Sequence, residues 1–371
     1  MLKNVKIENF RGFRSFELQQ LGRLNLLVGA NNSGKTSLLE AIQLLRSRNN
    51  LEPLRDTMIN RGEYFDNKRT DTQELNIRHL FYNHKIEPSS RFSISGINDT
   101  REEKFVASIG LRPIDQHFDP NVDTNTGPTN LGNNFVFDFT IEWIHENERE
   151  HWDRPLSYYD GLPEQYIRQQ RIIGVPKKTE TRTQFVTSSA LTSEKMVELF
   201  DQIVLTPEEN LVQEALQSIE PKIKRIAPIS SEKYRRTESH EGFVVLLSDS
   251  DQRVPIGSMG DGIWRMLGLA LATVGSSDGV LFVDEIDTGL HFSAMSNMWK
   301  LVWETAKRLN VQVFATTHSS DCWTSLASIA DQEGIAEDGI TIKRIERGKE
   351  TGIAFSEREI VIAAQRGIEV R

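Results

Sequence analysis

One eight-residue segment constrains this chain more than any other. Residues 29–36 read Gly-Ala-Asn-Asn-Ser-Gly-Lys-Thr, which satisfies every fixed position of the pattern G-x-x-x-x-G-K-[ST]. Residues 24–28 before it form an apolar run typical of a buried strand, and residues 36–46 after it carry apolar side chains on one helical face. The pattern therefore predicts a strand, a glycine loop and a helix whose N-terminus holds the phosphates of a nucleotide.

The residue types of this loop indicate how a nucleotide would be held. The Lys35 ammonium would reach the β- and γ-phosphates, and the Thr36 hydroxyl would bind Mg²⁺. ATP is expected over GTP, because the guanine-reading pattern N-K-x-D fails at Thr70. The predicted nucleotide-binding residues are Gly29, Ala30, Asn31, Asn32, Ser33, Gly34, Lys35, Thr36 and Ser37.

A second apolar strand, expected over residues 280–283, ends in two carboxylates. Asp284 would bind Mg²⁺ together with Thr36, and Glu285 would polarise the water that attacks the γ-phosphate. Asp284 and Thr36 are thus the predicted metal ligands. Glu285 is the predicted catalytic base, and Lys35 joins it as a catalytic residue.

A third apolar strand, expected over residues 311–315, leads to His318. A helix expected over 293–309 connects it to the acidic strand, so a right-handed crossover would set the two strands side by side. His318 would then contact the γ-phosphate or orient the attacking water. The alternative is a histidine that caps or packs near a helix start, where Ser319 and Ser320 are also plausible N-cap residues.

A second glycine-rich segment, residues 257–262, precedes a helix expected over 261–274. The Ser258 hydroxyl and exposed N–H groups suit a phosphate at a helix N-terminus. One ATP cannot sit on two separate helix N-termini of one subunit unless they converge. One alternative is that this second motif serves the ATP of a partner subunit, and another is an ordinary helix start.

These four motifs, in this order, resemble the head of an ABC-type ATPase. More narrowly, the chain is similar to the RecF, SMC and OLD (overcoming lysogenization defect) group, on residues 7–13, 29–36, 259–262, 284–291 and 315–319. The resemblance implies an α/β fold, a P-loop head in which helices flank a parallel sheet beside an antiparallel β lobe. It also implies an ATP-sandwich homodimer, in which Ser258 and Gly260 complete the opposite site and residues 288–291 cross the interface.

The spacing of the motifs suggests how the chain is divided. Residues 1–48 and 240–371 are expected to form the ATPase core, and residues 49–239 an inserted lobe of mixed α and β structure. Strands are expected over 77–82, 91–97, 104–111 and 135–144, with a long loop over 112–134. The chain ends too soon after His318 for a fused Toprim nuclease domain. It therefore resembles stand-alone OLD-like ATPases of bacterial anti-phage systems, whose effector is a separate protein such as a nuclease.

Composition and net charge limit which binding partners and which cellular compartment are expected. The formal net charge of −9 argues against a polybasic coat or membrane-surface protein. A single cysteine, no signal-peptide pattern and no apolar run of membrane-spanning length predict a cytoplasmic protein without a membrane partner. Two basic segments would suit a DNA or RNA backbone, with a solvated surface as the alternative. Their residues are Arg168, Arg171, Lys177, Lys178 and Arg182, then Lys222, Lys224, Arg225, Lys233, Arg235 and Arg236.

Three functions stay open at this point. The first is an Mg-dependent ATPase whose nucleotide-gated dimerisation regulates an effector in nucleic-acid metabolism or defence. The second is a RecF-like repair ATPase that binds DNA directly. The third is a scaffold or sensor that holds ATP with slow turnover.

Overall fold

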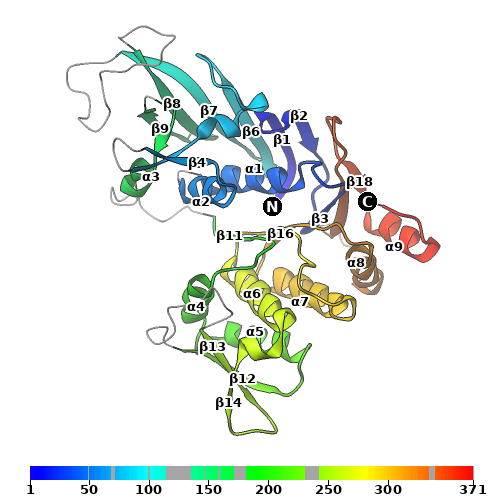
Figure 1. The fold of residues 1–371 in the computed structure, drawn as a ribbon. Coiled ribbons are helices and arrows are strands. Elements are labelled where there is room, and N and C mark those ends of the chain that lie inside the picture. Colours follow the sequence, from blue (N-terminus) through cyan, green and yellow to red (C-terminus); the bar gives the residue numbers. More distant parts are fainter. Residues whose placement is uncertain are drawn as a thin grey trace. The chain divides into compact units, whose positions relative to one another are not determined.

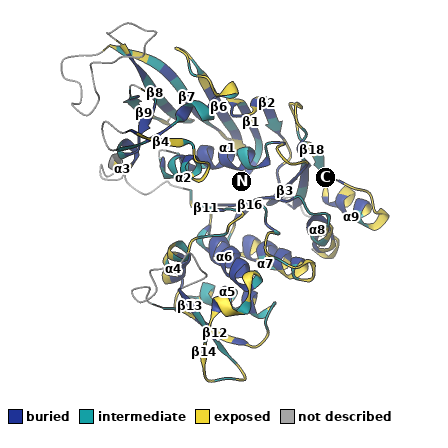
Figure 2. Cartoon of the chain, viewed as in Figure 1, coloured by how far each residue is buried: buried dark blue, intermediate teal, exposed yellow. Residues whose placement is uncertain are grey.

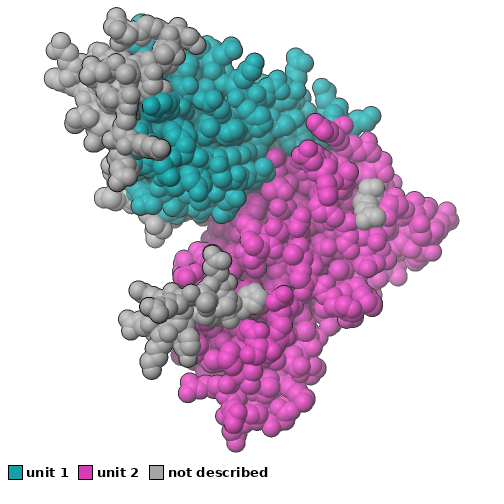
Figure 3. All heavy atoms as spheres, viewed as in Figure 1, with its two compact units in different colours: residues 1–20, 40–180, 348–352 teal, residues 21–39, 181–347, 353–371 magenta. Residues whose placement is uncertain are grey.

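A computed structural model defines the fold (Figure 1). The structure describes residues 1–48, 50–67, 72–98, 101–113, 135–146, 148–157, 159–170, 181–229, 242–333 and 339–370. The chain divides into two compact units, coloured separately in Figure 3. Unit 1 comprises residues 1–20, 40–180 and 348–352, and unit 2 comprises residues 21–39, 181–347 and 353–371.

Unit 1 is built on an antiparallel sheet with the strand order β2-β1-β6-β7-β8-β9. Its strands are β1 (Leu2–Phe10), β2 (Phe13–Leu18), β6 (Arg91–Asn98), β7 (Arg101–Pro113), β8 (Phe135–His145) and β9 (Glu148–Pro155). Aromatic side chains fill one face of this sheet, where Phe92 packs against Phe10, Phe81 and Phe105. The expected β lobe is therefore confirmed.

Smaller elements complete unit 1. A short sheet has the order β10-β5-β4, from β4 (Tyr64–Asn67), β5 (Thr72–Leu75) and β10 (Leu162–Pro163). The helices here are α2 (Glu52–Asn60) and α3 (Gln165–Gln170), with the 3₁₀ turns η1 (Ile77–Leu80) and η2 (Tyr82–His84).

The strand expected over residues 77–82 is wrong, because η1 and η2 occupy this segment. Ile77 and Leu80 are both buried, and a spacing of three residues puts them on one side of a 3₁₀ turn. Asn83 has a φ of +61°, which ends any extended run. The other three expected strands are confirmed as β6, β7 and β8. In the region of the expected loop, β7 continues to Pro113, and residues 114–134 lie outside the described residues.

Unit 2 contains the predicted parallel sheet, with the order β11-β15-β16-β3-β17-β18. Neighbouring strands are parallel except at the edge, where β18 runs antiparallel to β17. The strands are β3 (Leu24–Val28), β11 (Thr183–Val186), β15 (Val280–Val283), β16 (Gln312–Thr316), β17 (Ile340–Arg344) and β18 (Ile353–Phe355). Every residue of β3, β15 and β16 is buried (Figure 2), which explains why these strands are nearly continuous apolar runs.

Helices of unit 2 cover this sheet and share one apolar core with it. They are α4 (Ser193–Asp201), α5 (Pro207–Gln217), α6 (Asp261–Gly275), α7 (Met295–Arg308), α8 (Ser320–Glu333) and α9 (Glu357–Arg366). A small antiparallel sheet, β12-β13-β14, packs with them and consists of β12 (Ile223–Pro228), β13 (Phe243–Leu247) and β14 (Arg253–Pro255). Within the described residues, no helix has both the length and the apolar composition needed to cross a membrane.

The two units differ from the division expected over 1–48 and 240–371 against 49–239. Residues 1–20 belong to unit 1, because β1 hydrogen-bonds to β6. Residues from Thr181 onward belong to unit 2, because β11 pairs with β15 and helices α4 and α5 enter the core of that unit. The boundary also falls within helix α1 (Lys35–Ser47), between Leu39 and Glu40.

A buried charge network in unit 1 holds the turn between β1 and β2. Arg11 is 4% exposed and contacts Glu63 through Nη1 and Nη2, at 2.5 and 3.0 Å. Its Nε lies 2.8 Å from a carboxylate oxygen of Glu40, whose other oxygen accepts a hydrogen bond from Arg61 at 2.5 Å. Burial raises the pKa of Glu40, and the charges of Arg11 and Arg61 oppose that rise. The network is thus balanced only while both arginines face their carboxylates.

Removal of one buried carboxylate should therefore be costly. We expect Glu40→Ala to lower the free energy of unfolding by about 3–5 kcal/mol, because it leaves buried arginine charge uncompensated. Urea unfolding followed by circular dichroism measures this. Lys195→Ala, which breaks an exposed pair with Glu198, is the matched control and should leave the midpoint almost unchanged. Equal midpoints for the two variants would contradict the contribution of the network.

Candidate functional site

The predicted phosphate loop is the turn from β3 into α1, within unit 2. Its backbone enters the left-handed region at Asn32 (φ +59°) and Gly34 (φ +98°), and Gly29 has a φ of +140°. A Cβ atom at Gly29 would lie 2.3 Å from the carbonyl oxygen of Ile345, so only glycine fits there. Gly29 thus allows the close approach of this loop to the chain beyond β17.

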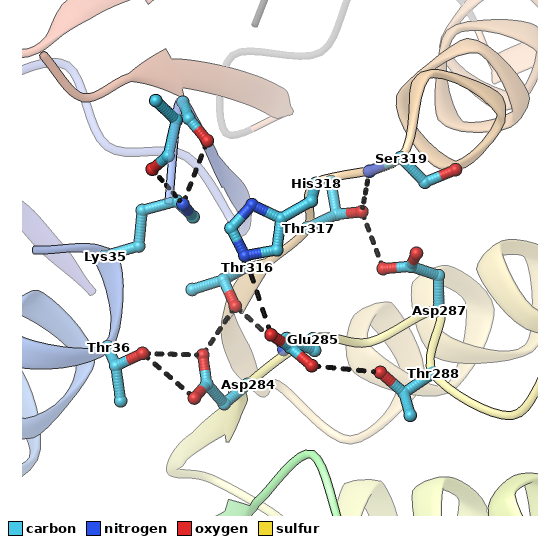
Figure 4. Close-up of polar contacts among 12 residues, drawn as sticks. Lys35, Thr36, Asp284, Glu285, Asp287, Thr288, Thr316, Thr317, His318 and Ser319 are labelled. Carbon is cyan, nitrogen blue, oxygen red and sulfur yellow. Dashed lines mark hydrogen bonds and ion pairs between the residues drawn. The ribbon is translucent and has the colours of Figure 1, made fainter. Parts of the chain in front are cut away.

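Lys35 and Ser33 present the polar groups that a phosphate would contact. The Lys35 ammonium donates to the carbonyl oxygens of Gly29 and Ala30, both at 2.9 Å (Figure 4). Burial lowers the pKa of Lys35, while the charges of Asp284 and Glu285 oppose that fall. The Ser33 hydroxyl is buried and has no hydrogen-bond partner among the described residues. A buried cation and an unsatisfied hydroxyl beside a helix N-terminus fit a phosphate group.

Thr36 and Asp284 meet although they are 248 positions apart in the sequence. The Thr36 Oγ1 lies 3.1 and 3.0 Å from the two carboxylate oxygens of Asp284. A hydroxyl has one proton to donate, so Thr36 keeps oxygen lone pairs for another partner. One hydroxyl and one carboxylate fit Mg²⁺, which takes one or two carboxylates and completes its shell with phosphate oxygens and water. In the described part of the chain, no cluster of three or more His, Cys, Asp or Glu residues offers an all-protein metal site.

Glu285 sits in an uncommon backbone conformation, with a φ of +47°. Its N–H donates to the Thr316 hydroxyl at 2.8 Å, and its carbonyl oxygen accepts from Arg265 at 2.9 Å. The side chain is 41% exposed, so its carboxylate is open to water. This combination of a fixed backbone and an accessible carboxylate suits a general base.

The structure brings His318 to Glu285, as the crossover argument predicts. β15 and β16 are parallel neighbours, and His318 Nε2 lies 3.6 Å from Glu285 Oε1 (Figure 4). The helix cap proposed as the alternative is supplied by Ser319 instead, whose hydroxyl accepts from the Cys322 N–H at 3.3 Å. His318 therefore faces the acidic strand end and does not cap α8.

Ser258 and Gly260 lie just before helix α6. Ser258 is exposed in the 3₁₀ turn η5 (Ile256–Met259), and Gly260 is exposed with a φ of +92°. Space around Gly260 is open, since a Cβ atom built there would meet nothing within 4 Å. Both residues are accessible to a second molecule, and their role in a partner's site stays a prediction.

Sequence reasoning missed Arg265, on helix α6. Its side chain is 3% exposed and donates to the carbonyl oxygens of Thr187, Asp284 and Glu285, at 2.7, 3.2 and 2.9 Å. Burial lowers the pKa of Arg265 to about 10, against the nearby charges of Asp287, Asp284 and Glu285. An arginine inside a continuous apolar helix was the available sign, because a buried guanidinium needs several acceptors.

The basic segments are described only in part. Arg168 is exposed and paired with Glu164, and Lys222 is exposed and paired with Asp249. Arg182, Lys224 and Arg225 are also exposed. The remaining members lie outside the described residues, namely Arg171, Lys177, Lys178, Lys233, Arg235 and Arg236.

Comparison with known proteins places this site in a family. A family model described as an AAA ATPase domain matches residues 1–322. The "ATP/GTP phosphatase" of Helicobacter pylori is 22% identical over 343 residues, which cover 86% of each chain. Shorter matches include the DNA replication and repair protein RecF of Clostridioides difficile, 43% identical over 44 residues and 12% of each chain. The DNA double-strand break repair Rad50 ATPase of Methanopyrus kandleri is 50% identical over 44 residues, 12% of this chain and 5% of that protein.

Among solved structures, an SMC head bound to the C-terminal winged-helix domain of ScpA is similar, with a TM-score of 0.47 and 12% identity. The match covers 96% of this chain and 98% of that one. The matched family model spans most of the 371 residues. It includes the phosphate loop, the acidic strand and the histidine strand. The chain therefore belongs to the AAA ATPase domain family, and it is an ATPase.

Proposed function

We propose that this chain hydrolyses ATP with Mg²⁺ at the site formed by residues 29–37, Asp284, Glu285 and His318. We further propose that ATP-dependent pairing of two copies regulates a partner protein. The observation that supports the site best is the contact of Thr36 with Asp284, because it joins the phosphate loop to the acidic strand end. A hydroxyl and a carboxylate at that junction are the groups that an ATP-bound Mg²⁺ needs.

Each side chain of the site has a distinct task in this proposal. On nucleotide binding, the Lys35 ammonium exchanges the carbonyl oxygens of its own loop for the phosphate oxygens. Its positive charge then offsets the negative charge of the phosphates. Mg²⁺, when bound, would neutralise developing charge on the phosphate oxygens. Glu285 accepts a proton from water through a carboxylate whose two oxygens face His318 at 3.6 Å and the Thr288 hydroxyl at 3.3 Å. These neighbours limit the directions in which the carboxylate turns.

Pairing of two copies rests on the exposed residues near the site. Ser258 and Gly260 are accessible before α6, and Phe292, directly after the segment 288–291, is 62% exposed. ATP bound in one copy would contact Ser258 and Gly260 of the other. A ligand that contacts both copies favours the paired state by its extra affinity for that state, which makes the assembly responsive to ATP.

The regulated partner is proposed to be a separate effector, such as a nuclease, in nucleic-acid metabolism or anti-phage defence. A cytoplasmic setting is part of this proposal, because the single cysteine, Cys322, cannot form a disulfide within the chain. Direct DNA binding is the second candidate. It is supported by the exposed Lys224 and Arg225 on β12 and by RecF and Rad50, whose names place those proteins in DNA repair.

Glu285→Gln tests the assignment of the base. We expect steady-state ATP hydrolysis to fall by about 100-fold or more, because general base catalysis contributes about 10²–10⁴-fold. ATP with Mg²⁺ should then hold the variant as a dimer, as measured by light scattering after gel filtration. Glu304→Gln, on the exposed face of α7, is the matched control and should behave as the parent protein. Unchanged hydrolysis in Glu285→Gln would overturn the assignment, and a monomer that binds ATP would overturn the pairing.

Lys35→Ala tests the phosphate contact. We expect ATP binding to weaken by about 10- to 100-fold, since a hydrogen bond to a charged group contributes about 1.5–3 kcal/mol. Titration with a fluorescent ATP analogue measures the affinity. Lys300→Ala, which removes an exposed lysine from α7, should leave it unchanged. Equal affinities for the two variants would show that phosphates bind elsewhere.

A salt titration separates the second candidate from the first. If DNA binds directly, affinity for duplex DNA should fall steeply with salt, and the double variant Lys224→Ala, Arg225→Ala should reduce that slope by about 2 units. Absence of salt-dependent DNA binding by the parent protein would exclude this candidate and leave regulation of a protein effector.

A further inference from the structure

The backbone conformation of Glu285 is energetically unfavourable, so contacts with neighbouring residues must stabilise it. A non-glycine residue held at positive φ costs about 1–3 kcal/mol and persists only where surrounding contacts dictate it. Glu285 is such a residue, and it follows directly after Asp284. The contacts that hold this turn therefore determine where both carboxylates lie.

Thr316, the last residue of β16, supplies a contact to each of the two acidic residues. Its side chain is 1% exposed and lies between them (Figure 4). The Thr316 Oγ1 accepts the N–H of Glu285 at 2.8 Å and lies 2.6 Å from Oδ1 of Asp284. Because the N–H can only donate, the hydroxyl proton is free to point at the carboxylate. One hydroxyl thus orients the backbone of Glu285 and the side chain of Asp284 together.

The main chain of Thr316 strengthens this arrangement. Its carbonyl oxygen accepts the N–H of Ile286 at 3.0 Å. Thr316 therefore binds the N–H groups on both sides of the Glu285 Cα, one through its side chain and one through its carbonyl. A turn held at both peptide groups cannot rotate about Glu285 without breaking one of these bonds.

Packing alone does not require a hydroxyl at this position. The residues of β16 before it, at 313–315, are buried and apolar, and valine has the same branched shape as threonine. Valine would meet the packing requirement at residue 316, but it would leave the Glu285 N–H without its partner. The hydroxyl is the group that links strand β16 to both acidic residues.

We propose that Thr316 is a positioning residue for ATP hydrolysis. Its hydroxyl sets the Asp284 carboxylate beside the Thr36 hydroxyl, where Mg²⁺ would bind, and fixes the left-handed turn that presents Glu285 to water. This inference rests on the roles proposed above for Asp284 and Glu285. Thr316 itself touches neither nucleotide nor water in this role and acts through its two neighbours.

The test compares Thr316→Val, which removes only the hydroxyl, with Thr316→Ser, which retains it. Thr341→Val is the matched control, because Thr341 lies in β17 of the same sheet and its hydroxyl donates to the Asn25 amide oxygen, at 2.9 Å, away from the acidic turn. For each variant, kcat, the KM for ATP and the Mg²⁺ concentration at half-maximal rate are measured, together with the melting temperature.

Thr316→Val should lower kcat by about 10- to 100-fold, since small displacements of catalytic groups have effects of that size. Its KM for ATP should stay within about threefold, because the phosphate loop is untouched, and its half-maximal Mg²⁺ concentration should rise by about fivefold or more. Thr316→Ser should recover most of kcat and a parental Mg²⁺ requirement. Thr341→Val should show parental kinetics even if its melting temperature changes.

A purely structural role predicts a different result, in which Thr316→Val melts earlier but retains the parental kcat and Mg²⁺ requirement. That result overturns the proposal, as does a folded Thr316→Ser that is as slow as Thr316→Val. If Thr316→Val does not fold, Thr316→Ala takes its place in the comparison with Thr316→Ser.

Glu285→Gln distinguishes failure of this inference from failure of the proposed function. If Glu285→Gln is inactive while Thr316→Val is normal, only the role of Thr316 falls, and if Glu285→Gln is active, the proposed function falls first.

Discussion

Parallel hydrogen bonding among β15, β16 and β3 is the interaction on which the site depends. The register pairs Val283 with Ala315 and Thr316 with Leu27, so the carboxyl ends of the three strands reach the same edge of the sheet. Each strand then continues into a different polar segment, namely the phosphate loop, the Asp284–Glu285 turn and the His318 segment. A shift of one strand by two residues would preserve its buried face and separate these segments by about 7 Å.

The opposite end of the same sheet is held by buried amides, which explains how the register is maintained. Asn25 accepts from the Gly22 N–H and donates to the carbonyl oxygens of Gly22 and Val313. Gln312 donates to the same Gly22 carbonyl at 2.8 Å. Such bonds satisfy polar groups that lie within an apolar core, and they tie β3 to β16 at their amino ends. The amino ends thus stabilise the sheet, and the carboxyl ends present the residues that we propose act on ATP.

Two of the non-glycine residues at positive φ lie in the segments where that chemistry is expected. Glu285 and Asn32 both adopt positive φ values, one beside the acidic strand and one in the phosphate loop. Thr316 and Arg265 hold the peptide groups of Glu285 from two other elements, β16 and α6, so the cost of the turn is offset by contacts that are distant in sequence. Helix α6 begins directly after Gly260, at the end of the second glycine-rich segment. Through Arg265, the same helix also contacts the turn at Glu285, the proposed base.

Local sequence patterns were enough to predict some parts of the site. Residues 29–36 predict their own loop because glycine, lysine and threonine at that spacing suit a phosphate, and residues 280–285 predict a buried strand that ends in carboxylates. The contacts between distant residues, such as Thr36 with Asp284 and Thr316 with Glu285, become visible only in the folded chain, because strand register sets them and no short segment encodes that register. The same reason explains why residues 1–20 join unit 1, and why Ile77 and Leu80 form a 3₁₀ turn. Pairing partners and burial, which lie outside any local window, select among the structures that a short segment permits.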